Sequence, residues 1–171
     1  GYGTFEDCTN LTDVTIPDSV ISIGERAFYN CKSLKSVTIG NDVTNIGSSA
    51  FYGCNNLTNI TIPDSVTSIG KSAFDGCTSL VSVTLSKSIT TIEYSTFFGC
   101  SSLTSIEIPK SVTTIVNFAF CNCTNLTDVY YDGTQSEWNK INIGHSNEFL
   151  TNASLRCSCL LYTSPSPRDC S

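Results

Sequence analysis

The sequence is organised by a period of 23 residues. Phenylalanine, cysteine and leucine each recur at this interval six times, in phase and without an insertion. The positions are Phe5, Phe28, Phe51, Phe74, Phe97 and Phe120; Cys8, Cys31, Cys54, Cys77, Cys100 and Cys123; and Leu11, Leu34, Leu57, Leu80, Leu103 and Leu126. A unit this short cannot bury its own apolar face, so the units must stack on one another.

Each unit contains a pattern that predicts two short extended segments. From Leu57 to Ile62 the apolar residues end in strict alternation, which is typical of a strand with one buried face. Pro63 ends that strand because it has no backbone N–H to donate. After a turn, residues 66–69 are expected to form a second, shorter extended segment.

A glycine and an Ala-Phe pair follow the second segment. We expect a positive φ at Gly70 and its equivalents. Glu93 and Val116 replace this glycine in two later units, so the local backbone is expected to differ there. Ala73 and Phe74 are predicted to begin one helical turn that ends at the next cysteine.

The unit resembles the leucine-rich repeats of the BspA-like type. Residues from Leu57 to Cys77 match the pattern L-x-x-I-x-I-P-x-S-V-x-x-I-G-x-x-A-F-x-x-C at nearly every position. The resemblance implies a right-handed leucine-rich-repeat solenoid, mainly β, with one short helical turn per 23-residue repeat. A parallel sheet of short strands would lie along one side. Residues 1–131 are assigned to six such repeats, the first of them truncated.

Two further segments follow the repeats. Residues 132–158 are assigned to a C-terminal cap, because Val129–Ala153 resembles the cap of the same family. The only tryptophan, Trp138, lies there on a short helix expected over residues 135–140. Residues 159–171 break the period and resemble a translated sequencing adapter; the alternative is a disordered tail rich in proline and serine. The chain also begins inside a repeat, which suggests a piece of a longer protein.

Charge and hydropathy argue against two classes of partner. The formal net charge is −6, and no basic patch exists that would bind nucleic acid or anionic lipid. No apolar run approaches the roughly 20 residues that a membrane span needs, so no membrane insertion is expected within this chain.

The residues that could form a metal site or a catalytic site lack the spacing that such sites require. The six periodic cysteines are interpreted as buried thiols, with stacked disulfides as the weaker alternative. Cys121 and Cys123, like Cys157 and Cys159, form a C-x-C pair, but zinc needs four converging ligands. His145 is the only histidine, and no nucleophile motif stands near it. We therefore expect no cofactor, no metal and no enzymatic activity.

One outward-facing column of the predicted sheet is the candidate site. Threonine suits an exposed sheet face whether or not that face binds anything. Val81, Glu107, Tyr130 and Tyr131 interrupt the threonine pattern, and exposed aromatic side chains are better candidates for contacts. The resemblance places partner contacts on this sheet. The candidate partner-binding residues are Thr38, Thr61, Thr84, Glu107 and Tyr130.

The function expected from the resemblance is protein binding. The chain would be a module of a secreted or cell-surface, adhesin-like protein, and its partner would be a host or matrix protein. Two alternatives remain open from the sequence: a targeting module of a larger secreted enzyme, and a structural spacer. Fold alone does not decide among them.

Overall fold

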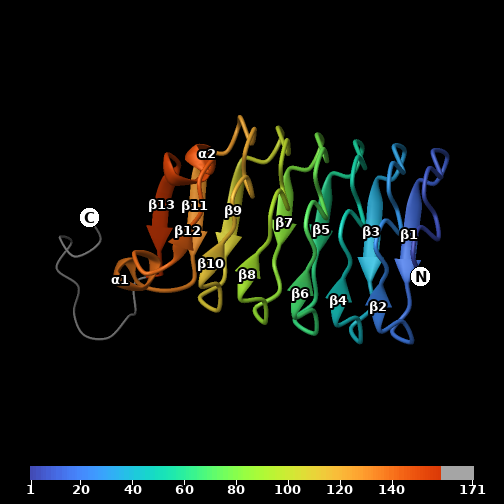
Figure 1. Cartoon of the computed structure of the whole chain (residues 1–171), viewed down its shortest axis with the longest axis horizontal. Coiled ribbons are helices and arrows are strands. Elements are labelled where there is room, and N and C mark those ends of the chain that lie inside the picture. The colour runs from blue at the N-terminus through green and yellow to red at the C-terminus, as the bar shows by residue number, and fades with distance from the viewer. Residues whose placement is uncertain (159–171) are drawn as a thin grey trace.

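A computed structural model describes residues 1–158 as coils stacked along one axis. The N-terminal coil lies at one end of the stack and the cap at the other (Figure 1). The prediction for residues 159–171 falls outside the described residues.

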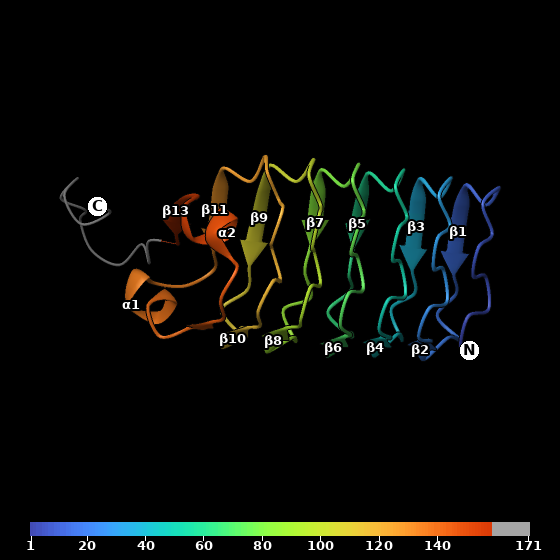
Figure 2. The same ribbon diagram turned by 45° about the horizontal axis from the view of Figure 1, so that its top comes forward.

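Two lines of short parallel strands run along the stack, as the sequence predicted (Figure 2). The first line begins just after the periodic leucine and ends at or before the proline position. It comprises β1 (Asp13–Ile16), β3 (Ser36–Ile39), β5 (Asn59–Thr61), β7 (Ser82–Thr84), β9 (Ser105–Ile108), β11 (Asp128–Tyr131) and β13 (Ser154–Cys157). The second line comprises β2 (Ser22–Ile23), β4 (Asn45–Ile46), β6 (Ser68–Ile69), β8 (Thr91–Ile92), β10 (Thr114–Ile115) and β12 (Asn142–Ile143).

The strands pair in the register that the period demands. Between repeats, each residue faces the residue 23 positions later, as Val14 faces Val37. Hydrogen bonding groups the first line as β1–β3, β5–β7 and β9–β11–β13. The second line is grouped as β2–β4–β6 and β8–β10–β12.

The core consists of columns of like residues. The rings of the periodic phenylalanines stack nearly parallel; Phe51 and Phe74, for example, have centroids 5.4 Å apart with an interplanar angle of 3°. Each buried cysteine donates its thiol hydrogen to the carbonyl of a phenylalanine in the preceding coil, as Cys77 does to Phe51 at 3.2 Å. Burial raises the pKa of Cys54 to about 12. The predicted column of buried thiols is therefore confirmed from Cys31 onward.

The segment from the glycine to the cysteine, which we call the turn segment (residues 24–31 and their equivalents), is not helical. The amide of Ala27 donates to the carbonyl of Gly24, three residues back, but the next amide, of Phe28, donates to Ala50 in the following coil. Arg26 adopts φ +55°, a left-handed conformation that a right-handed helix cannot include. The turn segment is a chain of β-turns bonded to its neighbour, and the predicted helical turn is not confirmed.

Close packing, and not a positive φ, explains why glycine recurs at the 23-residue spacing of Gly24, Gly47 and Gly70. None of the three has a positive φ, so that prediction is wrong. A Cβ built at Gly70 would lie 2.4 Å from the backbone nitrogen of Ser48 in the preceding coil. Where Glu93 replaces this glycine, β6 and β8 do not pair, and the second line is interrupted.

The cap begins with the predicted short helix, α1 (Gln135–Trp138). Thr134 and Glu137 form a capping box, in which each side chain bonds to the other residue's backbone amide. The rings of Trp138 and Tyr131 pack edge to face, with centroids 5.4 Å apart. A second helix, α2 (Glu148–Thr151), was not predicted.

Asn147 closes the end of the stack. In the preceding coil the amide of Phe97 donates to the backbone carbonyl of Ala119. In the cap, no backbone carbonyl accepts from Phe120, and its amide donates instead to the Asn147 side-chain oxygen at 3.0 Å. The Asn147 amide group donates to the carbonyls of Val116 and Gly144, at 3.0 and 2.8 Å. This buried side chain thus replaces the backbone groups of a further coil.

Candidate functional site

The outward-facing side chains of β1, β3, β5, β7, β9, β11 and β13 form one surface, the strand face. Successive strand residues point to opposite sides of a sheet, so β3 alternates between exposed and buried positions along its length. The five candidate residues predicted from the sequence are all exposed on this face: Thr38, Thr61, Thr84, Glu107 and Tyr130.

The register brings these candidates into one column. Thr61 lies opposite Thr84, and Glu107 lies opposite Tyr130. Thr38 lies opposite Thr15, in the group of strands nearest the N-terminus. This stretch of the face carries threonine hydroxyls at regular spacing, and its one charged strand residue, Asp13, lies at the N-terminal end on β1.

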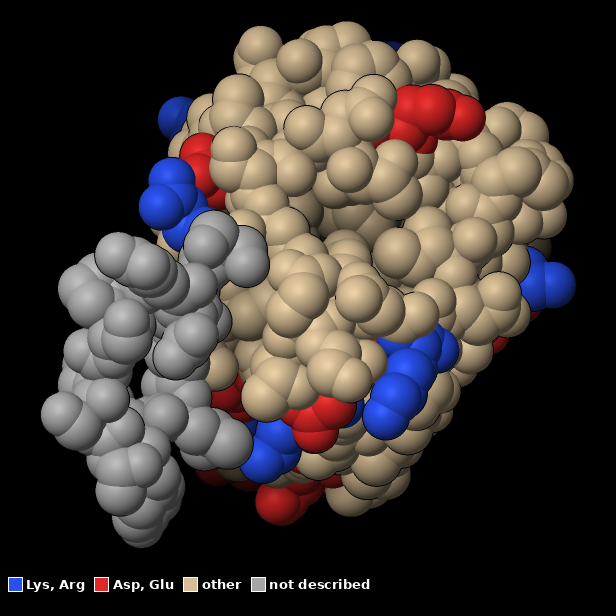
Figure 3. Space-filling view, turned by 90° about the vertical axis from the view of Figure 1, so that its left-hand side faces the viewer, with Lys and Arg blue, Asp and Glu red and all other residues tan. Residues whose placement is uncertain are grey.

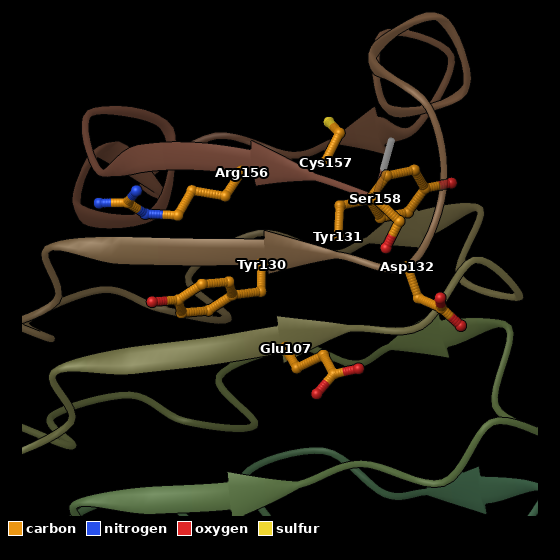
Figure 4. Close-up of a pocket in the computed structure, with 7 residues that line it drawn as sticks. All are labelled: Glu107, Tyr130, Tyr131, Asp132, Arg156, Cys157 and Ser158. Atoms are coloured by element: carbon orange, nitrogen blue, oxygen red, sulfur yellow. The ribbon is translucent and has the colours of Figure 1, made fainter. Parts of the chain in front are cut away.

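Charged and aromatic groups gather at the C-terminal end of the strand face. Figure 4 shows Glu107, Tyr130 and Arg156 on three adjacent strands, and Tyr130 lies opposite both of the others in the sheet register. The Arg156 guanidinium also donates a hydrogen bond of 3.0 Å to the Asp128 carboxylate. The pKa of Asp128 is lowered by a hydrogen bond from Thr127 and then by the one from Arg156.

An open hollow of about 250 Å³ lies beside these groups. Its lining includes Glu107, Tyr130, Asp132 and Arg156. In Figure 4 the side chains of Tyr130 and Arg156 extend in the same direction, and those of Glu107 and Asp132 point the other way. Tyr131, which the sequence suggested as an exposed aromatic, is buried at 3% exposure, because it occupies an inward-facing position of β11.

Sequence reasoning missed Arg156 as part of this face. The residue lies on β13, and this strand falls beyond the last repeat. The available signal was the alternation of polar and apolar residues in Ser154–Cys157, which continues the pattern of the earlier strands.

The remaining candidates for chemistry are not brought together. His145 is exposed in the cap, and its ring packs at 85° to the Phe118 ring with a centroid distance of 5.0 Å. Within residues 1–158, no group of three His, Cys, Asp or Glu side chains is placed to hold a metal ion. Over the same residues, no helix combines the length and hydropathy that a membrane crossing needs. Viewed from the cap end, the charged side chains are scattered and not gathered into a patch of one sign (Figure 3).

The fold, a solenoid of short parallel strands, is consistent with a leucine-rich-repeat protein. The chain belongs to the family of the BspA type leucine rich repeat region, whose model matches residues 1–127 and 44–156 in six copies. Repeats of this kind generally act as protein-interaction modules. A search of curated proteins gives no match.

Several solved bacterial proteins are similar to this chain. A leucine-rich repeat protein of T. pallidum aligns with 30% identity and a TM-score of 0.76, over 84% of this chain and 64% of its own. A leucine-rich repeat protein of Eubacterium ventriosum aligns with 26% identity and a TM-score of 0.69, over 93% of this chain and 47% of its own. One from Bacteroides ovatus has 25% identity and a TM-score of 0.51, over 94% and 58%. The chain thus spans less than two thirds of each relative.

Proposed function

We propose that this chain is a protein-binding module of a secreted or cell-surface protein of adhesin-like or host-interaction type, and that the strand face is its contact surface. The observation that carries the proposal is the rigid, exposed column that ends in Glu107, Tyr130 and Arg156. Tyrosine and arginine are enriched among the residues that dominate binding energy at protein interfaces.

The threonine part of the face suits the same role. Threonine is β-branched and has few side-chain conformations to lose, and the sheet holds its backbone fixed. Binding at this surface therefore costs little conformational entropy, because few side chains have to be ordered. Six coils at a spacing of about 4.8 Å give a face on the order of 25–30 Å long, which is enough to contact an extended segment or one side of a domain.

The proposed partner is a host or matrix protein, and the proposed location is extracellular or at the cell surface. Both proposals are supported by the type of repeat. A net charge of −6 gives no electrostatic attraction to nucleic acid.

The test is a binding screen of the purified chain against a panel of extracellular-matrix and host-surface proteins. One variant carries Thr38→Lys, Thr61→Lys and Thr84→Lys, and a second carries Tyr130→Ala. The matched control introduces lysine at three exposed threonines next to the second line of strands: Thr44, Thr67 and Thr90.

We expect a saturable partner whose affinity falls at least tenfold in both strand-face variants and stays within about twofold in the control, since tenfold is about 1.4 kcal/mol. Equal loss in the control would place the contact elsewhere. Absence of binding by folded protein would favour a targeting module or a spacer.

A further inference from the structure

Within residues 1–158, six of the ten aromatic side chains outside the phenylalanine column lie on the turn segments and not on the strand face. They are Tyr2, Tyr29, Tyr52, Tyr94, Phe98 and Phe118, whereas Tyr130 is the one aromatic residue exposed on the strands of this part of the chain. Aromatic side chains therefore also reach the surface, fully or in part, on a side that the repeat pattern did not single out.

A column on this side contains, from the N-terminus, Glu6, Tyr29, Tyr52, Asp75 and Phe98, which are spaced by the 23-residue period. The rings of Tyr29 and Tyr52 stack with centroids 4.7 Å apart and an interplanar angle of 7°. The coils of Asp75 and Phe98 continue the column through backbone hydrogen bonds. The amide of Gly53 donates to the Asp75 carbonyl, and the amide of Gly76 donates to the Phe98 carbonyl, each at 2.8 Å. A carboxylate therefore stands in line between two aromatic residues.

The start of this column already holds a guanidinium. Arg26 forms a salt bridge with Glu6, and its guanidinium carbon lies 4.2 Å from the centroid of the Tyr29 ring. The carboxylate comes from one coil, and the arginine and the ring come from the next. A guanidinium in this position is stabilised both by the ion pair with the carboxylate and by the cation–π contact with the ring.

The same arrangement recurs three periods later without its cation. Asp75 stands where Glu6 does, Phe98 stands where Tyr29 does, and Ser95, which is buried at 5% exposure, occupies the sequence position of Arg26. Ser95 and Arg26 even share the left-handed backbone, at φ +53° and +55°. Among residues 1–158, the two salt bridges are those of Arg26 and Arg156, and neither involves Asp75.

The Asp75 carboxylate lies in a partly desolvated position. Burial raises its pKa to about 6, although a hydrogen bond from the Ser72 side chain opposes the shift. The Asp75 charge in turn is the main cause of a raised pKa at Tyr52. A carboxylate in such surroundings is stabilised when a cation pairs with it.

The spacing leaves room for a flat group. Coils repeat at about 4.8 Å, so residues two coils apart, such as Tyr52 and Phe98, are separated by about 9–10 Å. A planar group in van der Waals contact with a ring on each side needs about 7 Å. The aspartate side chain is much shorter than a tyrosine and does not extend as far outward as its neighbours.

We propose that Tyr52, Asp75 and Phe98 form a binding position for an arginine side chain of a partner protein. The guanidinium would lie against Phe98 and pair with Asp75, as Arg26 does with Tyr29 and Glu6. Arginine fits better than lysine because its planar, weakly hydrated head stacks on rings and pairs with carboxylates through two hydrogen bonds. The position lies on the turn segments, so it does not depend on binding at the strand face.

The test uses N-acetyl-arginine methylamide as the probe and follows the side-chain NMR signals of Asp75, Tyr52 and Phe98. We expect saturable shifts at all three residues and a lower pKa for Asp75 in the presence of the probe. The Asp75→Asn variant should weaken binding at least threefold. Asp42→Asn, a change at an exposed acid elsewhere, should leave binding unchanged.

A second variant supplies the cation within the chain. Ser95→Arg should place a guanidinium against Phe98, lower the pKa of Asp75 and abolish probe binding. Absence of saturable shifts in the unmodified protein, or equal binding by Asp75→Asn, would overturn the proposal. Equal binding of the matching lysine methylamide would overturn the assignment to arginine.

Discussion

Replacing Phe74 by alanine tests how the stack is held together. The Phe74 ring is fully buried and stacks on Phe51 and Phe97, with centroids 5.4 and 5.5 Å away. Phe5, at the open end of the column, is the matched control. It is 43% exposed and stacks on Phe28 alone, at 5.3 Å.

The two positions should differ by a measurable amount. Truncation of a buried phenylalanine costs about 3–5 kcal/mol of unfolding free energy, through lost burial and the cavity left behind. At Phe5 nearly half of the side chain is already in water and one ring contact is absent. Its truncation should therefore cost about 1–2 kcal/mol. A difference of about 2–3 kcal/mol is large against a typical domain stability of about 5–15 kcal/mol.

Urea unfolding followed by circular dichroism, in reducing buffer, would measure both free energies. Amide hydrogen exchange would show where protection is lost. In a nearest-neighbour stack the loss from Phe74→Ala should centre on the coils of Phe51, Phe74 and Phe97. Equal destabilisation by the two variants, or uniform loss of protection along the chain, would refute this reasoning.

Three further changes follow from the packing and the charges. Gly70→Ala should lower the unfolding free energy by about 1–3 kcal/mol, because its Cβ meets backbone; exposed Ser68→Ala should stay within about 0.5 kcal/mol in the same urea titration. Asn147→Ala should cost about 1–3 kcal/mol and speed hydrogen exchange at the Phe120 amide, which loses its acceptor; unchanged exchange there would contradict the cap interpretation. Asp75→Asn should stabilise the protein at pH 7.5 but not below pH 4.

The sign of the Asp75 effect follows from proton linkage. Its pKa in the folded protein, about 6, lies above the usual 3.8, so the folded state holds the proton more tightly between these values. Stability therefore falls as pH rises through this window and stays lower above it. Solvent screening of a half-buried group reduces the effect from a limit near 3 kcal/mol to about 1 kcal/mol. A stability gain in the variant that persists at pH 3.5 would exclude this mechanism.

The strands and the core were predictable because their cause is local and repeated. In-phase apolar residues with period-2 alternation predict a half-buried strand wherever they occur, and the structure confirms each of these strands. The turn segment was mispredicted for the opposite reason. Ala27, Phe28 and Cys31 have a spacing that suits a helix, but alternate amides bond to another coil, and a local pattern cannot show a long-range partner.

The candidate sites divide in the same way. Exposure of Thr61 and Glu107 followed from strand alternation, whereas Arg156 lay outside the period and was missed. The Asp75 and Phe98 pair was missed because its column varies from repeat to repeat, and the period draws attention to positions that do not vary. Only the stacked coils show that these variable positions are neighbours.

The strict inter-coil register has a genetic consequence. Repeat coils contact one another at fixed separations, which are 23 positions in the strand pairs and ring stacks and 26 in the thiol bonds. A crossover between matching codons of two repeats therefore adds or removes whole coils and returns each phenylalanine, cysteine and leucine to its column. The cap stays bonded to whichever coil precedes it, provided that this coil keeps the groups that Asn147 binds. Such exchanges would lengthen or shorten the surface in steps of about 4.8 Å. Reach toward a partner can therefore change in one recombination event, without a new core having to evolve.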